Sequence, residues 1–423
     1  MKDSKKLHSL ALASAVLILY LLFVLSAASA ATEKNASSAG TYAYISNYNS
    51  NTVSIIDIAT NTVTATVPVG VNPLGVAMNP KGTKVYVANT GSSTVSVIDT
   101  ATNTVTATVP VGGYSQGVAV NSTGTKVYVT NGGSNSVSII DTATNTVTAT
   151  VPVGLSPSGV AVNPDGTKTY VANWDDSTVS VIDTATNTVT ATVPVGTNPF
   201  GVAVNPSGTK IYVTNYGSSG VSVIDTATNT VTATIDVGGY VGGVAVNPTG
   251  TKVYIANWIG YDALSVIDTD TNIVIDSVSV GSAPWGVAVN PSGTKIYVTN
   301  LWSGNVDVID TATDTITAKV DVGSYPGAFG QFIGTIPAQS VLPVANFTSN
   351  VTSGTVPLTV AFNDTSTGLP TSWKWSFGDG STSASRNRTH VYSKPGNYTV
   401  SLTATNAVGN NTKTISEYIT VKK

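Results

Sequence analysis

The chain has 423 residues, enough for two or three domains of ordinary size. Only 10% of the residues are charged, and 19 basic against 22 acidic residues leave no basic excess for binding nucleic acid through its phosphates. There is no cysteine and there are only two histidines, His8 and His390, which excludes disulfides, thiolate metal sites and cysteine nucleophiles. We therefore expect no bound metal or cofactor.

Residues 1–30 have the pattern of a secretory signal peptide. A start with three lysines is followed by an apolar run, Leu10 to Leu25, and then by Ala28-Ser29-Ala30, an A-x-A cleavage pattern. The alternative is an uncleaved anchor helix, because the 22 mostly apolar residues of 10–31 are long enough to span a bilayer. No second hydrophobic span follows, so the sequence predicts an exported protein with a short N-terminal segment at 31–40.

A unit of about 42 residues then repeats seven times. The repeats are marked by a tyrosine followed by a hydrophobic residue, a small residue and asparagine, at Tyr44, Tyr86, Tyr128, Tyr170, Tyr212, Tyr254 and Tyr297. Each period holds four short runs rich in Val, Ile, Thr and Tyr, separated by Gly, Pro, Asn and Asp. Four strands in such a period are typical of one propeller blade, so the sequence predicts an all-β, seven-bladed β-propeller over residues 41–334.

Proline and small residues predict the order of the strands within a blade. The TVTATVPV run carries a proline in the first four repeats (Pro68, Pro110, Pro152 and Pro194), and proline cannot donate to a central ladder, so this run should form the outer edge. The small-sided GVAV run should be innermost. The first repeat begins at Tyr42 in a second strand, and the last runs into a degenerate innermost segment, Pro326–Gly330. We therefore expect a C-terminal latch strand to complete the first blade and close the ring.

Two turns recur in the repeats. Asn79-Pro80-Lys81-Gly82 and its equivalents suit a tight hairpin, because proline fixes one φ and glycine permits a positive one. An aspartate opens a DTATNT turn in every repeat, at Asp57, Asp99, Asp141, Asp183, Asp225, Asp268 and Asp310. These seven acids resemble a metal ladder, but the sequence favours turns in which each carboxylate accepts backbone N–H groups.

The repeats carry a family motif. Lys126-Val127-Tyr128-Val129-Thr130-Asn131 contains the letters YVTN, and related versions occur in the other repeats. The units resemble the YVTN β-propeller repeats of archaeal surface-layer proteins, notably those of methanogens. The resemblance covers about residues 41–334 and implies a cell-surface or surface-layer protein.

Residues 343–423, after a linker at 335–342, have a different pattern. Several short alternating strands predict a small immunoglobulin-like sandwich. The characteristic residues of this part are Trp375, Phe377, Gly378, Asp379, Gly380, His390, Tyr392, Pro395, Gly396 and Tyr398. Their two motifs resemble the PKD domain, which implies an extracellular spacer or binding module. Asp379 is open to two interpretations, a Ca²⁺ ligand or a turn cap, and His390 is interpreted as a packed strand residue.

The loops on one face of the predicted propeller diverge between repeats and collect aromatic residues. These loops connect strand two to strand three and strand four to the next blade. The candidate binding residues are Trp174, Phe200, Tyr216, Tyr240, Trp258, Tyr261, Trp285, Trp302 and Tyr325, with Asp175 and Asp262 beside them and Tyr48, Tyr114 and Asp176 on the same loops. Exposed aromatic rings are typical of binding sites, and rings beside carboxylates suit sugars. The alternative is that each ring only fills space between blades or at the channel mouth.

The sequence favours a structural and adhesive cell-surface protein over an enzyme. Residues 41–334 contain no His, Arg, Cys or Glu, so Asp175 and Asp262 are the only candidate acid–base pair for a lyase or hydrolase acting on surface glycans or lactones. The expected partners are surface proteins, glycans or other surface-layer subunits, without nucleic acid and without a membrane span beyond the signal segment.

Glycosylation is a further expectation. N-x-[ST] sites occur at Asn35, Asn121, Asn346, Asn350, Asn363, Asn387, Asn397 and Asn410. Six of these eight lie in the C-terminal domain, which predicts a sugared, outward-facing module; the competing explanation is chance, since that domain is rich in Asn and Thr.

Overall fold

The computed structural model describes residues 39–258, 263–337 and 342–423. They belong to two compact units, Ser38–Pro337 and a smaller unit that contains residues 342–423, and each is described by itself. The expected signal peptide and the candidate residues Asn35, Tyr261 and Asp262 lie outside the described residues.

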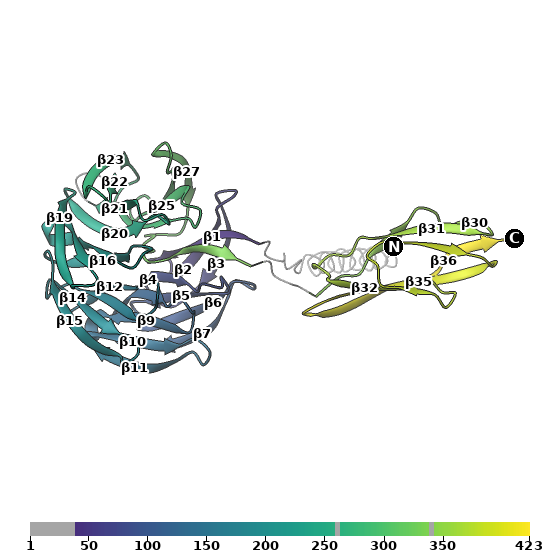
Figure 1. Ribbon diagram of the computed structural model, residues 1–423, viewed down its shortest axis with the longest axis horizontal. Coiled ribbons are helices and arrows are strands. Elements are labelled where there is room, and N and C mark those ends of the chain that lie inside the picture. Colours follow the sequence, from purple (N-terminus) through teal and green to yellow (C-terminus); the bar gives the residue numbers. More distant parts are fainter. Residues whose placement is uncertain (1–38, 259–262, 338–341) are drawn as a thin grey trace, which may run out of the picture. The chain divides into compact units, whose positions relative to one another are not determined.

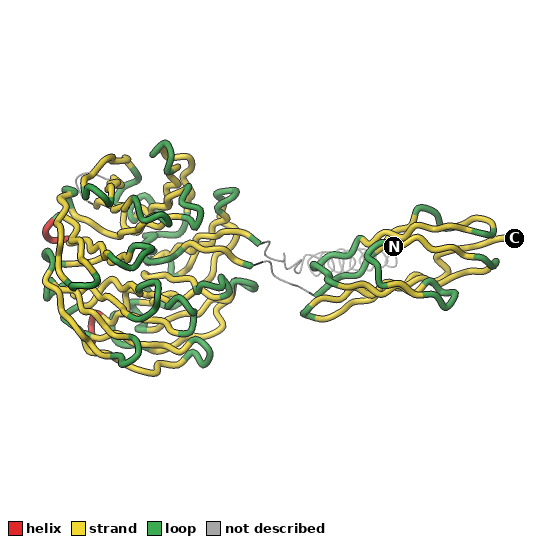
Figure 2. The backbone as a smooth tube through the Cα atoms, viewed as in Figure 1, coloured by secondary structure: helices red, strands yellow, loops and turns green. Residues whose placement is uncertain are grey.

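The larger unit is a ring of seven four-stranded antiparallel sheets, which confirms the predicted all-β, seven-bladed propeller (Figure 1). Figure 2 shows that nearly all of this unit is strand and short loop.

Each blade has four strands, which follow one another from the centre of the ring outward. Blade 1 contains β28 (Ile333–Ile336), β1 (Gly40–Asn47), β2 (Thr52–Asp57) and β3 (Thr62–Pro68). Blade 2 contains β4 (Pro73–Met78), β5 (Lys84–Asn89), β6 (Thr94–Asp99) and β7 (Thr104–Pro110). Blade 3 contains β8 (Ser115–Val120), β9 (Lys126–Asn131), β10 (Ser136–Asp141) and β11 (Thr146–Pro152), with the 3₁₀ turn η1 (Gly132–Ser134). Blade 4 contains β12 (Pro157–Val162), β13 (Lys168–Asn173), β14 (Thr178–Asp183) and β15 (Thr188–Pro194). Blade 5 contains β16 (Pro199–Val204), β17 (Lys210–Asn215), β18 (Gly220–Asp225) and β19 (Thr230–Asp236), with η2 (Tyr216–Ser218). Blade 6 contains β20 (Tyr240–Val246), β21 (Lys252–Trp258), β22 (Ala263–Asp268) and β23 (Ile273–Ser279). Blade 7 contains β24 (Pro284–Val289), β25 (Lys295–Asn300), β26 (Asn305–Asp310) and β27 (Thr315–Asp321).

The strand order within each blade is the predicted one. The proline-bearing run forms the outer strand, whose free edge is compatible with a missing N–H donor. Figure 1 shows β7, β11, β15, β19 and β23 at the periphery of the ring and β4, β12, β16 and β20 closer to its centre.

The repeated tyrosines hold neighbouring blades together. Tyr86 packs against Val127, Val129 and Ile140 of the next blade, and Tyr128 packs in the same way one blade further on. All seven tyrosines are 0–1% exposed. Burial raises the pKa of Tyr86 to about 12, so the phenol stays neutral in the core over the ordinary pH range. The residue that marks the repeat is therefore part of the apolar contact between neighbouring blades.

Glycine lets the innermost strands of adjacent blades approach each other closely. A Cβ atom on Gly159 would lie 2.2 Å from the carbonyl oxygen of Phe200, and one on Gly75 would lie 2.2 Å from that of Gln116. Real Cβ atoms do not approach backbone oxygen so closely. Crowding at the centre of the ring thus explains the small side chains of the GVAV run, as the sequence indicated.

The ring is closed by a latch strand, but this strand begins later than the sequence suggested. Pro326 forms an isolated bridge with Asn47, in the same way that Pro73 pairs with Asn89. The continuous ladder with β1 is made only by β28, from Ile333 to Ile336. The expectation that Pro326–Gly330 forms the latch is therefore wrong in position, because the extra residues around Phe329 turn into the centre of the ring first. The ring spans Gly40 to Ile336, slightly beyond the expected 41–334.

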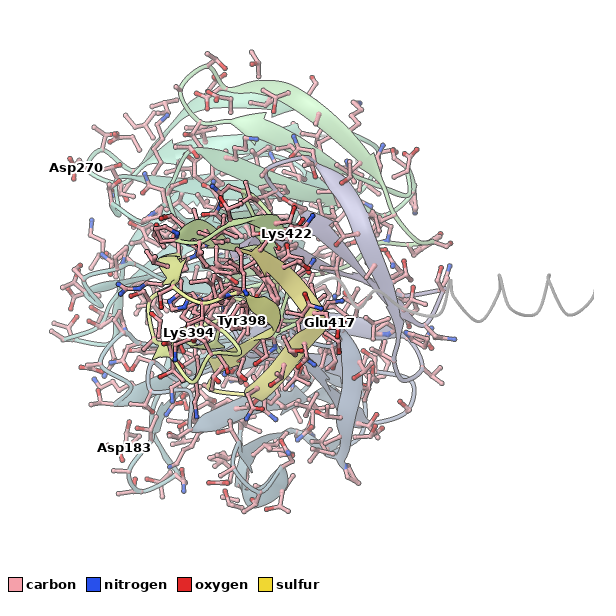
Figure 3. All side chains as sticks on the ribbon, turned by 90° about the vertical axis from the view of Figure 1, so that its right-hand side faces the viewer. Asp183, Asp270, Lys394, Tyr398, Glu417 and Lys422 are labelled. Atoms are coloured by element: carbon pink, nitrogen blue, oxygen red, sulfur yellow. The ribbon has the colours of Figure 1, made fainter. Side chains whose placement is uncertain are left out.

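The two repeated turns lie on one face of the ring. Asp99 accepts hydrogen bonds from the N–H groups of Ala101 and Thr102 at 3.0 and 3.1 Å, and the turn ends at Asn103 with φ 52°. Gly82 has φ 66° and donates its N–H to Asn79 O at 2.8 Å. Figure 3 shows Asp183 and Asp270, from turns of two different blades, projecting on the same side of the propeller.

The smaller unit is a two-sheet sandwich, as predicted. One sheet contains β29 (Phe347–Ser349), β31 (Leu358–Asp364) and β34 (Arg388–Tyr392). The other contains β30 (Ser353–Thr355), β36 (Gly409–Lys422), β35 (Gly396–Asn406), β32 (Ser372–Ser376) and β33 (Thr382–Ser383). Trp375, Phe377, Phe362, Phe347 and Tyr392 form the core between the sheets.

Candidate functional site: the aromatic face

The candidate aromatic residues of blades 4 to 7 form one connected cluster. Trp174 lies 5.1 Å from Tyr216 between ring centroids, and Tyr216 lies 5.7 Å from Trp258. Trp258 in turn lies 5.5 Å from Trp285 and 6.0 Å from Trp302. These rings come from four different repeats, so the ring of blades brings together residues that are far apart in the sequence. We call this side of the propeller the aromatic face.

Four of the candidate residues belong to strands rather than to loops. Phe200 lies in β16, Tyr240 begins β20, Trp258 ends β21 and Trp285 lies in β24. Phe200 is only 3% exposed, because it packs against Trp285 at 4.7 Å and against Phe329 at 5.2 Å. The expectation of an exposed loop residue is therefore wrong for Phe200, which lies beneath the face and fills space at the centre of the ring.

Other aromatic residues of this face remain open to solvent. The exposed fractions are 54% for Tyr114, 43% for Tyr240, 57% for Trp302 and 40% for Tyr325. Rings that only fill space between blades would be buried, as the repeated tyrosines are. The aromatic face therefore combines a packed layer with exposed rings above it.

The face surrounds a cavity of about 680 Å³ at the mouth of the central channel. Its walls combine two sets of residues. The first set comes from the loops: Tyr48, Thr90, Tyr114, Gly132, Gly133, Ser156, Trp174, Asp175, Leu301 and Tyr325. The second set comes from the innermost strands: Leu74, Gln116, Ser158, Phe200 and Trp285.

The sequence prediction missed most of the second set. Each member precedes the glycine of an innermost strand, as in Pro73-Leu74-Gly75 and Pro157-Ser158-Gly159. This position varies strongly between repeats whose other innermost residues hardly change. Variation at one position of a constant strand was the signal that could have identified these channel residues. Phe329, which contacts Phe200, was missed because it lies outside the regular repeat.

Asp175 is the only carboxylate among the described residues that line the cavity. Its Oδ2 accepts a hydrogen bond from the hydroxyl of Ser156, and its backbone N–H donates to Leu155 O at 3.3 Å. The neighbouring Asp176 instead accepts from the N–H of Leu155 at 2.6 Å and does not line the cavity. The acid–base pair of Asp175 with Asp262 stays a prediction, because Asp262 lies outside the described residues.

The opposite face has a different character. A second cavity of about 510 Å³ opens there, lined by valine and alanine of the innermost strands and by the Asn-Pro turns. The turn aspartates bind their own backbone, as Asp99 does, and within residues 39–258, 263–337 and 342–423 no group of three His, Cys, Asp or Glu could hold a metal ion. These geometries fit the turn interpretation of the seven acids.

In the smaller unit, Asp379 and His390 contact each other. His390 Nε2 lies 2.8 Å from Asp379 Oδ2, and the imidazole stacks on Phe377 at 4.3 Å. Partial burial opposes ionisation of Asp379, but hydrogen bonds from Ser381 N–H and His390 hold its pKa below its usual range. Asp379 accepts from Ser381 N–H within its turn, which matches the turn-cap interpretation, and His390 is a residue of β34 that packs on Phe377.

The candidate glycosylation sites differ in accessibility. The six asparagines in the smaller unit, Asn346, Asn350, Asn363, Asn387, Asn397 and Asn410, are all exposed. Asn121 is only 9% exposed, and its Nδ2 donates to Thr125 Oγ1 at 3.1 Å. Attachment of a sugar to Asn121 would break its turn, so among the described candidate sites the accessible ones are those of the smaller unit.

Comparison with known proteins supports the assignment of the smaller unit. Residues 340–421 match the family model of the PKD domain. The smaller unit is therefore a PKD domain. Domains of this family are typical of extracellular proteins. No curated protein matches the chain in sequence. The part of the chain that is described contains no helix long and apolar enough to cross a membrane.

Solved structures resemble the propeller. Hydrazine synthase of Kuenenia stuttgartiensis is similar with a TM-score of 0.57 and 21% identity, over 63% of this chain and 96% of that chain. A protein of unknown function from Desulfotomaculum acetoxidans has a TM-score of 0.60 and 16% identity, over 70% and 98% of the two chains. A candidate 6-phosphogluconolactonase of Bacteroides fragilis has a TM-score of 0.60 and 15% identity, over 71% and 99%. At these identities the similarity shows the propeller fold and carries no activity to this chain.

Proposed function

We propose that this chain is an exported cell-surface protein, part of or attached to a surface layer, that adheres to protein or glycan partners through the aromatic face. Three observations support the location. The N-terminal sequence has a signal-peptide pattern, the repeats resemble those of surface-layer proteins, and residues 340–421 form a domain typical of extracellular proteins.

One observation carries the binding role: a connected layer of aromatic rings surrounds a cavity and bears exposed rings above it. Trp302 and Tyr114 are each more than half exposed, although water contact with large apolar groups is unfavourable. Monomeric proteins keep such patches small unless the patch binds a partner. Aromatic rings offer a large contact area with little loss of side-chain freedom on binding, which suits a binding surface.

In a surface layer, many weak binding contacts can act together. Many copies presented on one cell can engage many ligands on another surface at once. The second contact then forms at the high effective concentration that the first one creates, so avidity can exceed single-site affinity by about 10²–10⁴. Tight binding of an isolated chain is therefore not required for adhesion.

The proposal is tested by binding of the purified, fluorescently labelled chain to intact cells of the source organism. We expect saturable binding, and binding at least about tenfold weaker for a variant with Trp174→Ala and Trp302→Ala, because aromatic anchors dominate such contacts. The control is Ile273→Ala, which removes a side chain that is 59% exposed on the outer strand of blade 6, away from the aromatic face. Thermal unfolding checks that the variants are folded.

Equal binding by the parent and the folded double variant would contradict the assignment of the site. The runner-up function is an exported lyase or hydrolase that uses Asp175. It predicts turnover of a glycan or lactone in a substrate screen, and Asp175→Asn or Asp262→Asn should remove this turnover but not the binding of the substrate.

A further inference from the structure

Most of the basic residues of the propeller lie on one of its faces, together with the seven turn aspartates. Seven of its eight lysines lie in or just after the Asn-x-x-Gly turns opposite the aromatic face: Lys81, Lys84, Lys126, Lys168, Lys210, Lys252 and Lys295. Several of them are held there, as Lys126 is by donating from Nζ to Thr184 O at 3.2 Å. The eighth, Lys319, has its Nζ 3.8 Å from the buried Asp307.

The aromatic face carries carboxylates without basic partners. Asp175 and Asp176 lie in the loop after β13, and Asp236 and Asp321 end the outer strands β19 and β27 on the same face. These four side chains form no salt bridge among the described residues. The electrostatic potential at this face is therefore negative, and it disfavours anionic ligands.

The walls of the cavity add to this preference. Tyr48, Tyr114, Trp174, Trp285 and Tyr325 line the cavity from different parts of the ring. The face of an aromatic ring carries negative partial charge, which attracts a cation within about 6 Å of its centre. Several rings around one space therefore favour a positive group more strongly than a neutral one.

Asp175 supplies a full negative charge at the wall. The Ser156 hydroxyl and the loop hydrogen bonds of Leu155 fix the position of its carboxylate. Its Oδ2 accepts a hydrogen bond from the Ser156 hydroxyl, while its Oδ1 accepts no hydrogen bond from any described residue. One carboxylate oxygen is thus held by the protein, and the other is left to pair with a ligand.

We propose that this cavity binds an organic cation, an ammonium or guanidinium group that inserts between the aromatic rings with its charge beside Asp175. The proposal rests on the proposed function, because it names the ligand chemistry of the same face. A cavity of about 680 Å³ is larger than one such group requires. The cavity therefore has room for more than the charged group alone. The cation is either a small quaternary amine or the lysine or arginine side chain of a protein.

The test is calorimetric titration of the full chain with two small molecules that have the same shape and differ in charge. Choline carries a quaternary nitrogen, and 3,3-dimethylbutan-1-ol has carbon in its place. We expect choline to bind at least about tenfold more tightly than the alcohol, because only choline gains the cation–π and carboxylate attraction. A third titration uses an acetylated arginine- and lysine-containing peptide against its citrulline and norleucine analogue. Tighter binding of the peptide than of choline identifies a protein as the source of the cation.

Two neighbouring aspartates provide matched variants. Asp175→Asn should weaken binding of the preferred cation about tenfold and reduce its dependence on salt, since a neutral amide replaces the charge at the cavity. Asp176→Asn removes the same charge from the adjacent residue, which does not line the cavity, and its amide oxygen can still accept from Leu155 N–H, so the affinity should change less than twofold.

Equal affinity for choline and the alcohol, together with equal affinity for the two peptides, would overturn the proposal, as would equal loss in the two asparagine variants. The cell-binding experiment separates this failure from failure of the proposed function. Cell binding that depends on Trp174 and Trp302 but is not inhibited by excess choline or the basic peptide keeps the adhesive role and rejects the cationic ligand. Absence of both kinds of binding rejects both.

Discussion

At the scale of single residues, blade 7 differs from the other blades by a buried charge. Asp307 in β26 is fully buried, at a position where the other six blades have a serine that accepts from an asparagine Nδ2, as Ser96 does from Asn89 at 2.9 Å. Asp307 Oδ2 accepts from Asn300 Nδ2 at 3.1 Å and from Gly281 N–H at 2.7 Å. Lys319 stands opposite Asp307, where blade 1 has Thr66 opposite Ser54. Two departures from the repeat thus compensate each other.

Replacement of only one partner should therefore be harmful. We expect Lys319→Thr to lower the free energy of unfolding of the propeller by about 1–3 kcal/mol, because it leaves a buried carboxylate without a cation. This is less than for a fully buried pair, since the lysine side chain is 56% exposed. Adding Asp307→Ser restores the pattern of the other blades and should recover most of the loss. Urea unfolding of the parent, of Lys319→Thr and of the double variant measures these free energies. A Lys319→Thr variant as stable as the parent would contradict the prediction.

The sequence indicated that the candidate aromatic residues share one face of the propeller, but not which of them are exposed. Trp302 and Phe200 both follow from divergence between repeats, yet one is 57% and the other 3% exposed. Phe200 is covered in part by Phe329, which lies beyond the last regular repeat. A contact between a residue that follows the last repeat and one in the fifth blade cannot be inferred from the periodicity of one repeat.

At the scale of elements, the innermost strands decide whether the ring can form. Their order and their small residues were predictable, because crowding leaves a mark in composition. The exact latch was not predictable, because β28 lies outside the repeat and is selected only by its ladder with β1. Ile333 and Ile336 are buried by that pairing and give no repeated signal of their own.

Crowding at the centre leads to a prediction for the innermost strand of blade 4. Gly159→Ala would place a Cβ 2.2 Å from Phe200 O, and backbone atoms of two blades would have to separate. We expect a loss of about 3 kcal/mol or more in the free energy of unfolding of the propeller. Gly113→Ala is the matched control, because its Cβ would meet only Ser134 Oγ at 3.5 Å and should change stability by less than about 0.5 kcal/mol. Denaturant unfolding monitored by tryptophan fluorescence distinguishes them, and equal stability of the two variants would reject the crowding explanation.

At the scale of the whole molecule, the chain divides into two units with separate hydrophobic cores. Tyr398, Lys394, Glu417 and Lys422, labelled in Figure 3, belong to the PKD unit, where Tyr398 donates to Lys394 O at 2.8 Å. Both units were predictable from sequence, because each carries its own pattern of strands and turns. How they act together was not, since neither pattern contains information about the other.

Separate cores predict separate unfolding. The Trp375 side chain is fully buried in the PKD unit and its Nε1 donates to Ser385 O at 2.9 Å. Trp375→Ala should cost about 3–5 kcal/mol, most of the stability of so small a domain. Scanning calorimetry should show two transitions for the parent and, for the variant, loss of the PKD transition with the propeller transition shifted by less than about 2 °C. A matching shift of both transitions would show that the units are energetically coupled.

The latch also determines how the propeller responds to mechanical tension. Gly40 pairs with Ile336 and Ala43 with Ile333, so the chain enters and leaves the ring at the same end of one antiparallel ladder. A force that pulls these two ends apart acts on one residue pair at a time, as in opening a zipper, rather than on the whole ladder in shear. A chain pulled through its PKD domain against the residues preceding β1 would therefore open its ring at the latch before any other blade is stretched.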